Sequence, residues 1–424
     1  MDPFARQIKG NVKWVPEIFD YTTVNCKCEF NTMDSAPFMP RNVVRESSFD
    51  WQGVSKPIIE NQKSIIYEAH VKGFTQQHPD IPVELRGTYL GMCHPVVIEH
   101  LRQLGVTALE IMPVTSKVNE ERLGNLGLSN YWGYNPICLM APEENFAIND
   151  PVTEMKTMVR ELHRAGIEVI MDVVFNHTCE SGYGGPFLSF RGLAENEYYH
   201  MDSHNGELSS VNYSGCGNTM NFDSPQTLKL TMDALRCWAE EYQIDGFRFD
   251  LAPIMARRHR NFDKHSPFFL AISQDPILSG LKMIAEPWDI GPDGYHLTGF
   301  PKDWQSWNDR YRDCSRKFWK GEPWMLMEMA QRFSGSSDLF IEQTYLSTVN
   351  YICSHDGFSL MDLVSYECRH NYANGENNED GDSHNCSWNY GIEGETDSRA
   401  VQLARLRVRK NLIAMLMLSK GTPM

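Results

Sequence analysis

The fold is decided by the segment "QIDGFRFDLA" (residues 243–252), an apolar run that ends in two opposite charges. In a β-strand successive side chains point to opposite faces, so Phe247 and Phe249 share one face while Arg248 and Asp250 share the other. The charged pair is therefore directed into one space at the end of the strand. A structural salt bridge is one interpretation, although a buried ion pair is costly to desolvate and is weak evidence for stability. A functional pair is the other, and this segment alone leaves both open.

The overall composition is that of an acidic globular protein. The chain has 424 residues, a length that suits a large α/β barrel with insertions or two domains. Its net charge of −16 argues against a nucleic acid or an anionic membrane as a partner, since both require a basic surface. The 11 cysteines show no repeated C-x-x-C pattern and fit a reducing compartment. The sequence has no signal-peptide-like start and no apolar run of about 18 residues, so we predict a cytoplasmic protein.

Segments typical of strands and helices alternate from residue 64 onward. The strand candidates are residues 64–74, 106–114, 167–177, 243–252, 281–289 and 348–358, and the helix candidates are residues 94–105, 152–166, 226–242 and 398–418. This alternation implies parallel strands with right-handed crossovers, in either a doubly wound sheet or a closed barrel. Residues 1–63 lack the pattern. We interpret them as a lead-in segment before an α/β barrel domain, residues 64–424, with long loop insertions.

Ionisable residues at the ends of the predicted strands favour the barrel. They are Asp172 with His177, Arg248 with Asp250, Glu286, and His355 with Asp356. In a barrel the carboxyl ends of the strands converge on one mouth, whereas in an open sheet they spread along an edge. A Gly-rich phosphate loop after the early strands, which a nucleotide-binding sheet would need, is also missing. The sequence therefore predicts a (βα)8 TIM-type barrel whose mouth collects these side chains.

Three kinds of chemistry could use four carboxylates at one mouth. A metal site is one, but the histidines lie on different loops and lack the fixed offsets of metal ligands. A purely structural cluster is another, although an excess of carboxylates is self-repelling. Glycoside hydrolysis requires one ionised and one protonated carboxyl group at the same sugar. Arg248 favours the ionised form of Asp250, and the apolar "KMIA" segment before Glu286 favours its neutral form.

Four segments together resemble the signature regions of a known superfamily. "DVVFNHT" (172–178), "GFRFDLA" (246–252), "EPWD" (286–289) and "NYICSHDG" (350–357) resemble, in order and spacing, those of the α-amylase superfamily, glycoside hydrolase family 13. Further segments resemble the bacterial glycogen debranching enzymes and isoamylases within it: "DSAPFMPR", "YEAHVKGFT", "RGTYLG", "NYWGYNP", "GCGNT" and "NDRYRD". The resemblance spans nearly the whole chain.

The resemblance implies a retaining hydrolase of the α-1,6 branch linkages in glycogen or a limit dextrin. It makes Asp250 the nucleophile, Glu286 the general acid/base, and Asp356 the third carboxylate, which holds and distorts the sugar. The implied substrate-binding residues are Tyr134, Asp172, His177, Arg248 and His355. Of these, the histidines would bond sugar hydroxyls, Arg248 would orient Asp250, Asp172 would support the site, and Tyr134 would stack beneath the sugar ring.

The resemblance implies a branched α-glucan as the partner and no cofactor. Asn176 resembles a calcium-ligand position of many amylases, so calcium stays open. The four signatures do not separate α-1,6 from α-1,4 cleavage. An α-1,4-acting amylase-type hydrolase or transglycosylase, and a non-catalytic glucan-binding fragment, therefore remain as alternatives.

Members of this family extend further at both ends than this chain. Residues 1–63 resemble the remnant of an N-terminal carbohydrate-binding β-sandwich and its linker. After "SKGTPM" (419–424) family members continue into an eighth strand, its helix and a C-terminal β-sandwich. We therefore expect an incomplete, seven-stranded barrel with open edges. Such a chain would fold poorly alone or associate with a partner.

Overall fold

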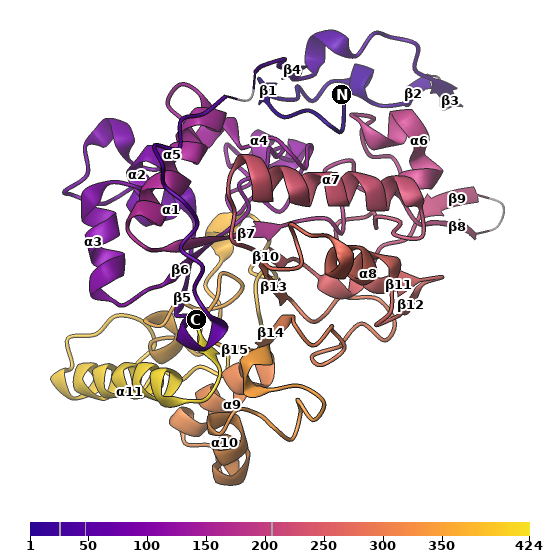
Figure 1. Ribbon diagram of the computed structural model, residues 1–424. Helices are drawn as coiled ribbons and strands as arrows, with labels where there is room; N and C mark the ends of the chain where they lie inside the picture. Colours follow the sequence, from indigo (N-terminus) through magenta and orange to yellow (C-terminus); the bar gives the residue numbers. More distant parts are fainter. Residues whose placement is uncertain (25–26, 47, 205–206) are drawn as a thin grey trace. The chain divides into compact units, whose positions relative to one another are not determined.

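The computed structural model describes residues 1–24, 27–46, 48–204 and 207–424 (Figure 1). The chain forms two compact units, the first of Met1–Ile59 and Ala69–Pro301 and the second of Glu60–Glu68 and Lys302–Met424. The predicted boundary at residues 63 and 64 falls inside the segment Glu60–Glu68, and the division into lead-in segment and barrel stays a prediction. Across the described ranges, no helix combines the length and the apolarity needed to cross a bilayer.

A parallel ladder of four strands forms the centre of the first unit. Its order is β6 (Ala108–Ile111), β7 (Glu168–Val173), β10 (Gly246–Phe249) and β13 (Lys282–Ala285). All residues of these strands are buried. Burial on both faces is typical of parallel sheets, because crossover helices cover them. The predicted strand at 243–252 is confirmed, although its regular part is shorter than the segment.

Each of these strands is preceded by a helix in the chain. The helices are α3 (Pro95–Gln103), α5 (Pro151–Arg164), α7 (Pro225–Glu241) and α8 (Pro267–Gln274). All four begin with proline directly after a side chain that caps the helix, as Asp150 does for α5 by accepting from the Thr153 N–H. The apolar face predicted for α5, with Met155 and Leu162, is fully buried.

Short elements complete the first unit. They are β1 (Ile8–Lys9), β2 (Tyr21–Val24), β3 (Lys27–Phe30), β4 (Arg41–Asn42), α1 (Val71–Thr75), α2 (Tyr89–Met92), α4 (Glu121–Asn125), α6 (Phe190–Tyr198), β8 (Met201–His204), β9 (Glu207–Ser210), β11 (Arg257–Arg258) and β12 (Asn261–Phe262). Ala5, Ile8 and Ile18 of the lead-in segment share a hydrophobic core with Ile137 and Leu188. The first part of the lead-in segment is therefore packed into this unit.

The second unit contains another parallel ladder, of β14 (Gln305–Asn308), β15 (Thr348–Asn350) and β16 (Thr422–Pro423). Its helices are α9 (Asp309–Lys320), α10 (Met325–Phe333) and α11 (Arg399–Leu418). Their core includes Tyr311, Leu412 and Leu416. The chain passes from this unit back into the first within β5 (Ile66–Ala69).

The expected loss of the eighth strand is wrong. Thr422 pairs with Val349 and Pro423 with Asn350, and the Met424 N–H donates to the Asn350 carbonyl at 2.8 Å. Gly421, with φ +125°, makes the turn that leads the chain into this strand. Counted along the chain, β5, β6, β7, β10, β13, β14, β15 and β16 make eight parallel strands. β16 therefore pairs with the edge of β15 that a seven-stranded barrel would leave open.

Candidate active site

Asp250 and Glu286 lie side by side at the ends of two adjacent parallel strands. The β10–β13 register ends with Phe249 opposite Ala285, so the next pair is Asp250 and Glu286. Backbone hydrogen bonds continue there, because Glu286 N donates to Phe249 O at 3.1 Å and Ala252 N donates to Glu286 O at 3.0 Å. Neighbouring strands run about 4.8 Å apart. The two predicted catalytic carboxyl groups therefore leave the sheet next to each other.

Arg248 is a fully buried cation shared by three carboxyl groups. Its Nη1 lies 2.9 Å from Asp172 Oδ2 and 3.0 Å from Asp250 Oδ1, and its Nη2 lies 3.2 Å from Glu286 Oε2. Burial alone lowers the pKa of this guanidinium, but Asp172, Glu286 and Asp250 outweigh burial and raise the pKa well above its usual value. Arg248 therefore stays charged, and its predicted pairing with Asp250 is confirmed.

Glu286 differs in one respect from its predicted environment. The side chain is buried, as expected after an apolar strand, but its Oε2 faces Arg248 and also accepts from the Leu251 N–H at 2.7 Å. Leu251 reaches this position because its backbone is left-handed, with φ +43° and ψ +53°. Two donors thus hold Oε2, and a proton on Glu286 belongs on Oε1. The environment of Glu286 is therefore partly polar, and not only apolar as the preceding strand suggests.

Asp172 is buried between Arg248 and Tyr134. The Tyr134 hydroxyl donates to Asp172 Oδ2 at 2.6 Å, and both oxygens of Asp172 accept from Arg248 Nη1. The Arg248 guanidinium carbon lies 6.0 Å from the centre of the half-buried Tyr134 ring, within cation–π range. Asp172 is therefore held by protein groups, which fits the supporting role predicted for it.

Asn176 connects Asp250 to His177. Its Nδ2 donates to Asp250 Oδ2 at 2.7 Å, so its Oδ1 must be the atom that lies 2.5 Å from His177 Nδ1. His177 Nε2 lies 2.8 Å from the Tyr134 carbonyl oxygen. Since both partners are acceptors, both ring nitrogens donate and the imidazole is protonated.

The electrostatics of His177 agree with this assignment. Burial acts to lower the pKa of His177, but Cys216, Asp250 and the Tyr134 carbonyl outweigh it and raise the pKa to about 9. The family resemblance implies that this ring bonds a sugar hydroxyl. Such a bond requires one of its two protein contacts to be exchanged.

The residues at Asn176 do not fit a calcium ion. The Oδ1 atom, which would be the ligand, receives a hydrogen bond from protonated His177 instead. Within the described ranges, no group of three or more His, Cys, Asp or Glu side chains is placed to hold a metal ion.

The second unit holds His355 and Asp356 just after β15. His355 Nδ1 lies 2.7 Å from Glu68 Oε1, and its Nε2 lies 3.3 Å from Asp356 Oδ1. Burial acts to lower the pKa of His355, but Glu68 and Asp356 outweigh it and raise the pKa well above its usual value. Glu68 also accepts from the His355 N–H at 3.0 Å. The imidazolium is thus clamped between two carboxylates.

The first unit brings six predicted site residues into one cluster of direct contacts: Tyr134, Asp172, His177, Arg248, Asp250 and Glu286. Within the second unit, His355 contacts Asp356. Sequence reasoning missed Glu68, although an acidic residue near the end of a predicted strand was the signal used elsewhere. It also missed the connection made by Asn176.

Comparisons with known proteins agree on one family. The family model for the alpha amylase catalytic domain matches residues 74–207. A glycogen operon protein GlgX homolog of Mycobacterium bovis is 46% identical over 433 aligned positions, covering 100% of this chain and 60% of that protein. A glycogen debranching enzyme of Erwinia tasmaniensis is 45% identical, covering 100% of this chain and 64% of that enzyme. The chain thus spans less than two thirds of the length of these curated relatives.

A solved structure has a similar fold. A pullulanase from Bacillus acidopullulyticus matches 95% of this chain and 49% of that protein with a TM-score of 0.67, at 23% sequence identity. The likeness, together with the eight parallel strands, confirms the predicted (βα)8 barrel.

Proposed function

The chain belongs to the α-amylase family, and from this premise we propose that it hydrolyses the α-1,6-glucosidic branch linkages of glycogen or of a limit dextrin. Identities of 45–46% to proteins named for glycogen debranching and for the glycogen operon support this substrate. The reaction would belong to glycogen catabolism in the cytoplasm. A branched α-glucan is the partner.

In the proposed reaction, Asp250 attacks the anomeric carbon of the first glucose of the branch while Glu286 gives a proton from Oε1 to the departing oxygen. Water, deprotonated by Glu286, then releases the sugar with retained configuration. A retaining pair needs carboxyl groups about 5–5.5 Å apart. The neighbouring register positions of Asp250 and Glu286 support this assignment, and they are the observation on which the proposal depends.

Arg248 suits both stages of this reaction. At the start Asp250 carries the negative charge and Glu286 is neutral; in the glycosyl enzyme Asp250 is esterified and Glu286 is ionised. Because Nη1 contacts Asp250 and Nη2 contacts Glu286, one guanidinium compensates the charge in either state without moving. Such a fixed charge stabilises the transition state without reorganisation.

The other roles rest on the family resemblance. We assign Asp356 the third-carboxylate role, with His355 as a donor to sugar hydroxyls. Tyr134 supplies the ring beneath the sugar, and Asp172 holds both Tyr134 and Arg248. His177 fixes Asp250 through Asn176.

The test compares a branched limit dextrin with linear amylose, with reducing ends as the readout. Release of short linear chains from the branched substrate alone supports the proposal. Cleavage of amylose indicates an α-1,4-acting enzyme instead, and binding without cleavage indicates a glucan-binding protein. Asp250→Asn should abolish release, whereas Asp293→Asn, at a side chain that is 85% exposed, should not. Circular dichroism on both variants identifies any loss of folding.

A further inference from the structure

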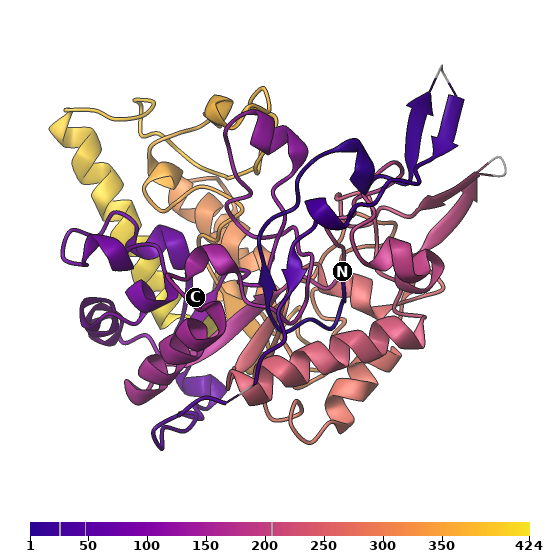
Figure 2. The ribbon, with the colours of Figure 1, turned by 90° about the horizontal axis from the view of Figure 1, so that it is seen from above.

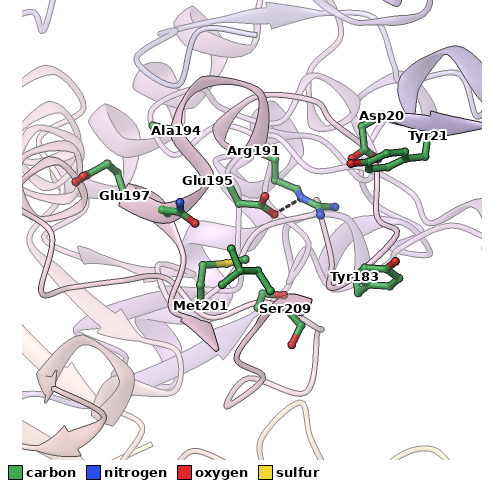
Figure 3. Close-up of a pocket in the computed structure, with 12 residues that line it drawn as sticks. Asp20, Tyr21, Tyr183, Arg191, Ala194, Glu195, Glu197, Met201 and Ser209 are labelled. Atoms are coloured by element: carbon green, nitrogen blue, oxygen red, sulfur yellow. Dashed lines mark hydrogen bonds and ion pairs between the residues drawn. The ribbon is translucent and has the colours of Figure 1, made fainter. Parts of the chain in front are cut away.

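A cavity of about 540 Å³ lies in the first unit beside α6, with a lining separate from the carboxylate cluster. Asp20 and Tyr21 of the lead-in segment line it together with Tyr183, Arg191, Glu195 and Ser209 (Figure 3). Binding sites for small ligands commonly have volumes of about 300–1,000 Å³. Tyr183 belongs to the chain segment that runs from His177 into α6.

A second cavity of about 540 Å³ continues the first. The two share Asn196, Met201 and Leu208 in their linings, and the second extends to Asp223 and Arg260. Figures 1 and 2 show the β2–β3 and β8–β9 hairpins projecting on the same side of this unit, next to α6. The shared lining residues join the two cavities into one groove. Two connected cavities suit a chain-like ligand better than a single compact one.

The groove exposes aromatic rings. Tyr21 is 46% exposed, Tyr183 is 81% exposed, and Phe30, whose ring centre lies 4.6 Å from that of Tyr21, is 73% exposed. Aromatic side chains bury large areas when they meet a partner, and Tyr adds a polar group at the ring edge. Three such rings beside a cavity form a surface that can stack on the apolar face of a pyranose.

Arg191 provides a fixed polar group in the groove. Its Nε lies 2.8 Å from Glu195 Oε1, its Nη1 donates to the Gly185 carbonyl at 2.8 Å, and its guanidinium lies 4.7 Å from the Phe187 ring centre. Figure 3 shows Arg191 directed toward the side of the cavity that holds Asp20 and Tyr21. Because several contacts hold the guanidinium, a ligand would meet a preformed site with little ordering of the side chain.

The chemistry of this lining indicates a neutral, hydroxyl-rich ligand. Acidic side chains outnumber Arg191 in the first cavity, with Asp20, Glu195 and Glu197, so an anionic ligand is disfavoured. Carboxylates only accept hydrogen bonds, and sugar hydroxyls can donate to them. We propose that the groove binds a linear α-1,4-linked glucan chain as a second site, separate from the site of hydrolysis. This rests on the proposed function for the identity of the sugar.

Retardation in native gels that contain glycogen tests this site, with maltoheptaose as a soluble competitor. We expect the double variant Tyr21→Ala/Tyr183→Ala to raise the dissociation constant for glycogen about five- to tenfold, given the stacking energy of aromatic rings. Tyr345→Ala removes a comparably exposed ring, 44% exposed, elsewhere in the chain and should bind like the unmodified protein. Hydrolysis of a short branched dextrin should be unchanged in the double variant.

Two outcomes separate this proposal from the proposed function. Unchanged retardation of the double variant overturns the second site, whatever the chain hydrolyses. Weaker retardation in a chain that cleaves no branched dextrin supports the second site while rejecting debranching. Circular dichroism of the double variant excludes unfolding as the cause.

Discussion

Arg248 Nη2 lies 3.2 Å from Glu286 Oε2, so the proposed general acid and the proposed nucleophile share one buried cation. The same guanidinium also holds Asp172. Removing it would leave three buried carboxyl groups without their common partner.

The first prediction concerns stability at Arg248. Arg248→Met should lower the free energy of unfolding by about 3–5 kcal/mol, the cost of breaking a buried ion pair on one side. Arg248→Lys keeps the charge but has one ammonium group where the contacts need two separated nitrogens. Its free energy of unfolding should therefore lie between those of the unmodified protein and the Met variant. Urea unfolding followed by circular dichroism measures both. Unchanged stability of the Met variant would contradict the shared-cation arrangement.

The second prediction separates the roles of the two carboxyl groups by the leaving group. Glu286→Gln should slow cleavage of a branched dextrin about 10²–10⁴-fold, because proton donation is lost. On α-maltosyl fluoride the loss in kcat/KM, which reports the first step, should be much smaller, since fluoride departs without a proton. The loss in kcat should remain, because Glu286 also deprotonates the water of the second step. Asp250→Asn should lose both activities. Equal losses in kcat/KM of the Glu286 variant on the two substrates would argue against its acid role.

The third prediction is a loss of stability at high pH that depends on His177. The pKa of His177 is raised from 6.5 to about 9 in the folded protein. Between these two pH values the native state binds a proton that the unfolded state has lost. The free energy of unfolding should therefore be highest below pH 6.5 and fall by up to about 3 kcal/mol as the pH rises through 9. His177→Gln should flatten this dependence in urea unfolding at about pH 6.5 and about pH 9.5, on either side of the pKa shift.

Two further variants serve as controls for this experiment. His259, with a side chain that is 85% exposed, should give an unchanged pH dependence as His259→Gln. Cys216→Ser should reduce the decline, because Cys216 is the strongest of the neighbours that raise the pKa of His177. A decline that persists in His177→Gln would assign it to another group.

The fourth prediction separates the ring of Tyr134 from its hydroxyl. Tyr134→Phe loses the 2.6 Å bond to Asp172 and should destabilise the protein by about 1 kcal/mol, with KM nearly unchanged. Tyr134→Ala loses the ring as well and should raise KM roughly three- to tenfold. Steady-state kinetics on the branched dextrin distinguish the two. A similar KM for both variants would exclude stacking on the sugar.

Much of the site could be predicted because the strand ends are local features. The alternation of side chains in "GFRFD" already places Arg248 with Asp250, and Glu286 directly follows an apolar strand. The contact between Arg248 and Glu286 depends instead on register, with Arg248 opposite Ile284, and register is set between segments that are far apart in the sequence.

Other features could not be predicted, because no sequence pattern indicates them. The two residues of β16, Thr422 and Pro423, are too few to show an alternation. Asn176 has its role only because Asp250 and His177 come to opposite sides of its amide. Glu68 precedes the end of β5 by one residue, and its partner His355 lies 287 positions away in the chain.

The left-handed backbone at Leu251 has a consequence for protein engineering. A residue with a Cβ in this conformation costs on the order of 1 kcal/mol, which glycine would avoid. The substitution Leu251→Gly would relieve this cost, but it would also remove a partly buried side chain and give the unfolded chain more backbone freedom. The same change would loosen the peptide whose N–H anchors Glu286, so thermal tolerance and turnover are expected to fall together at this position.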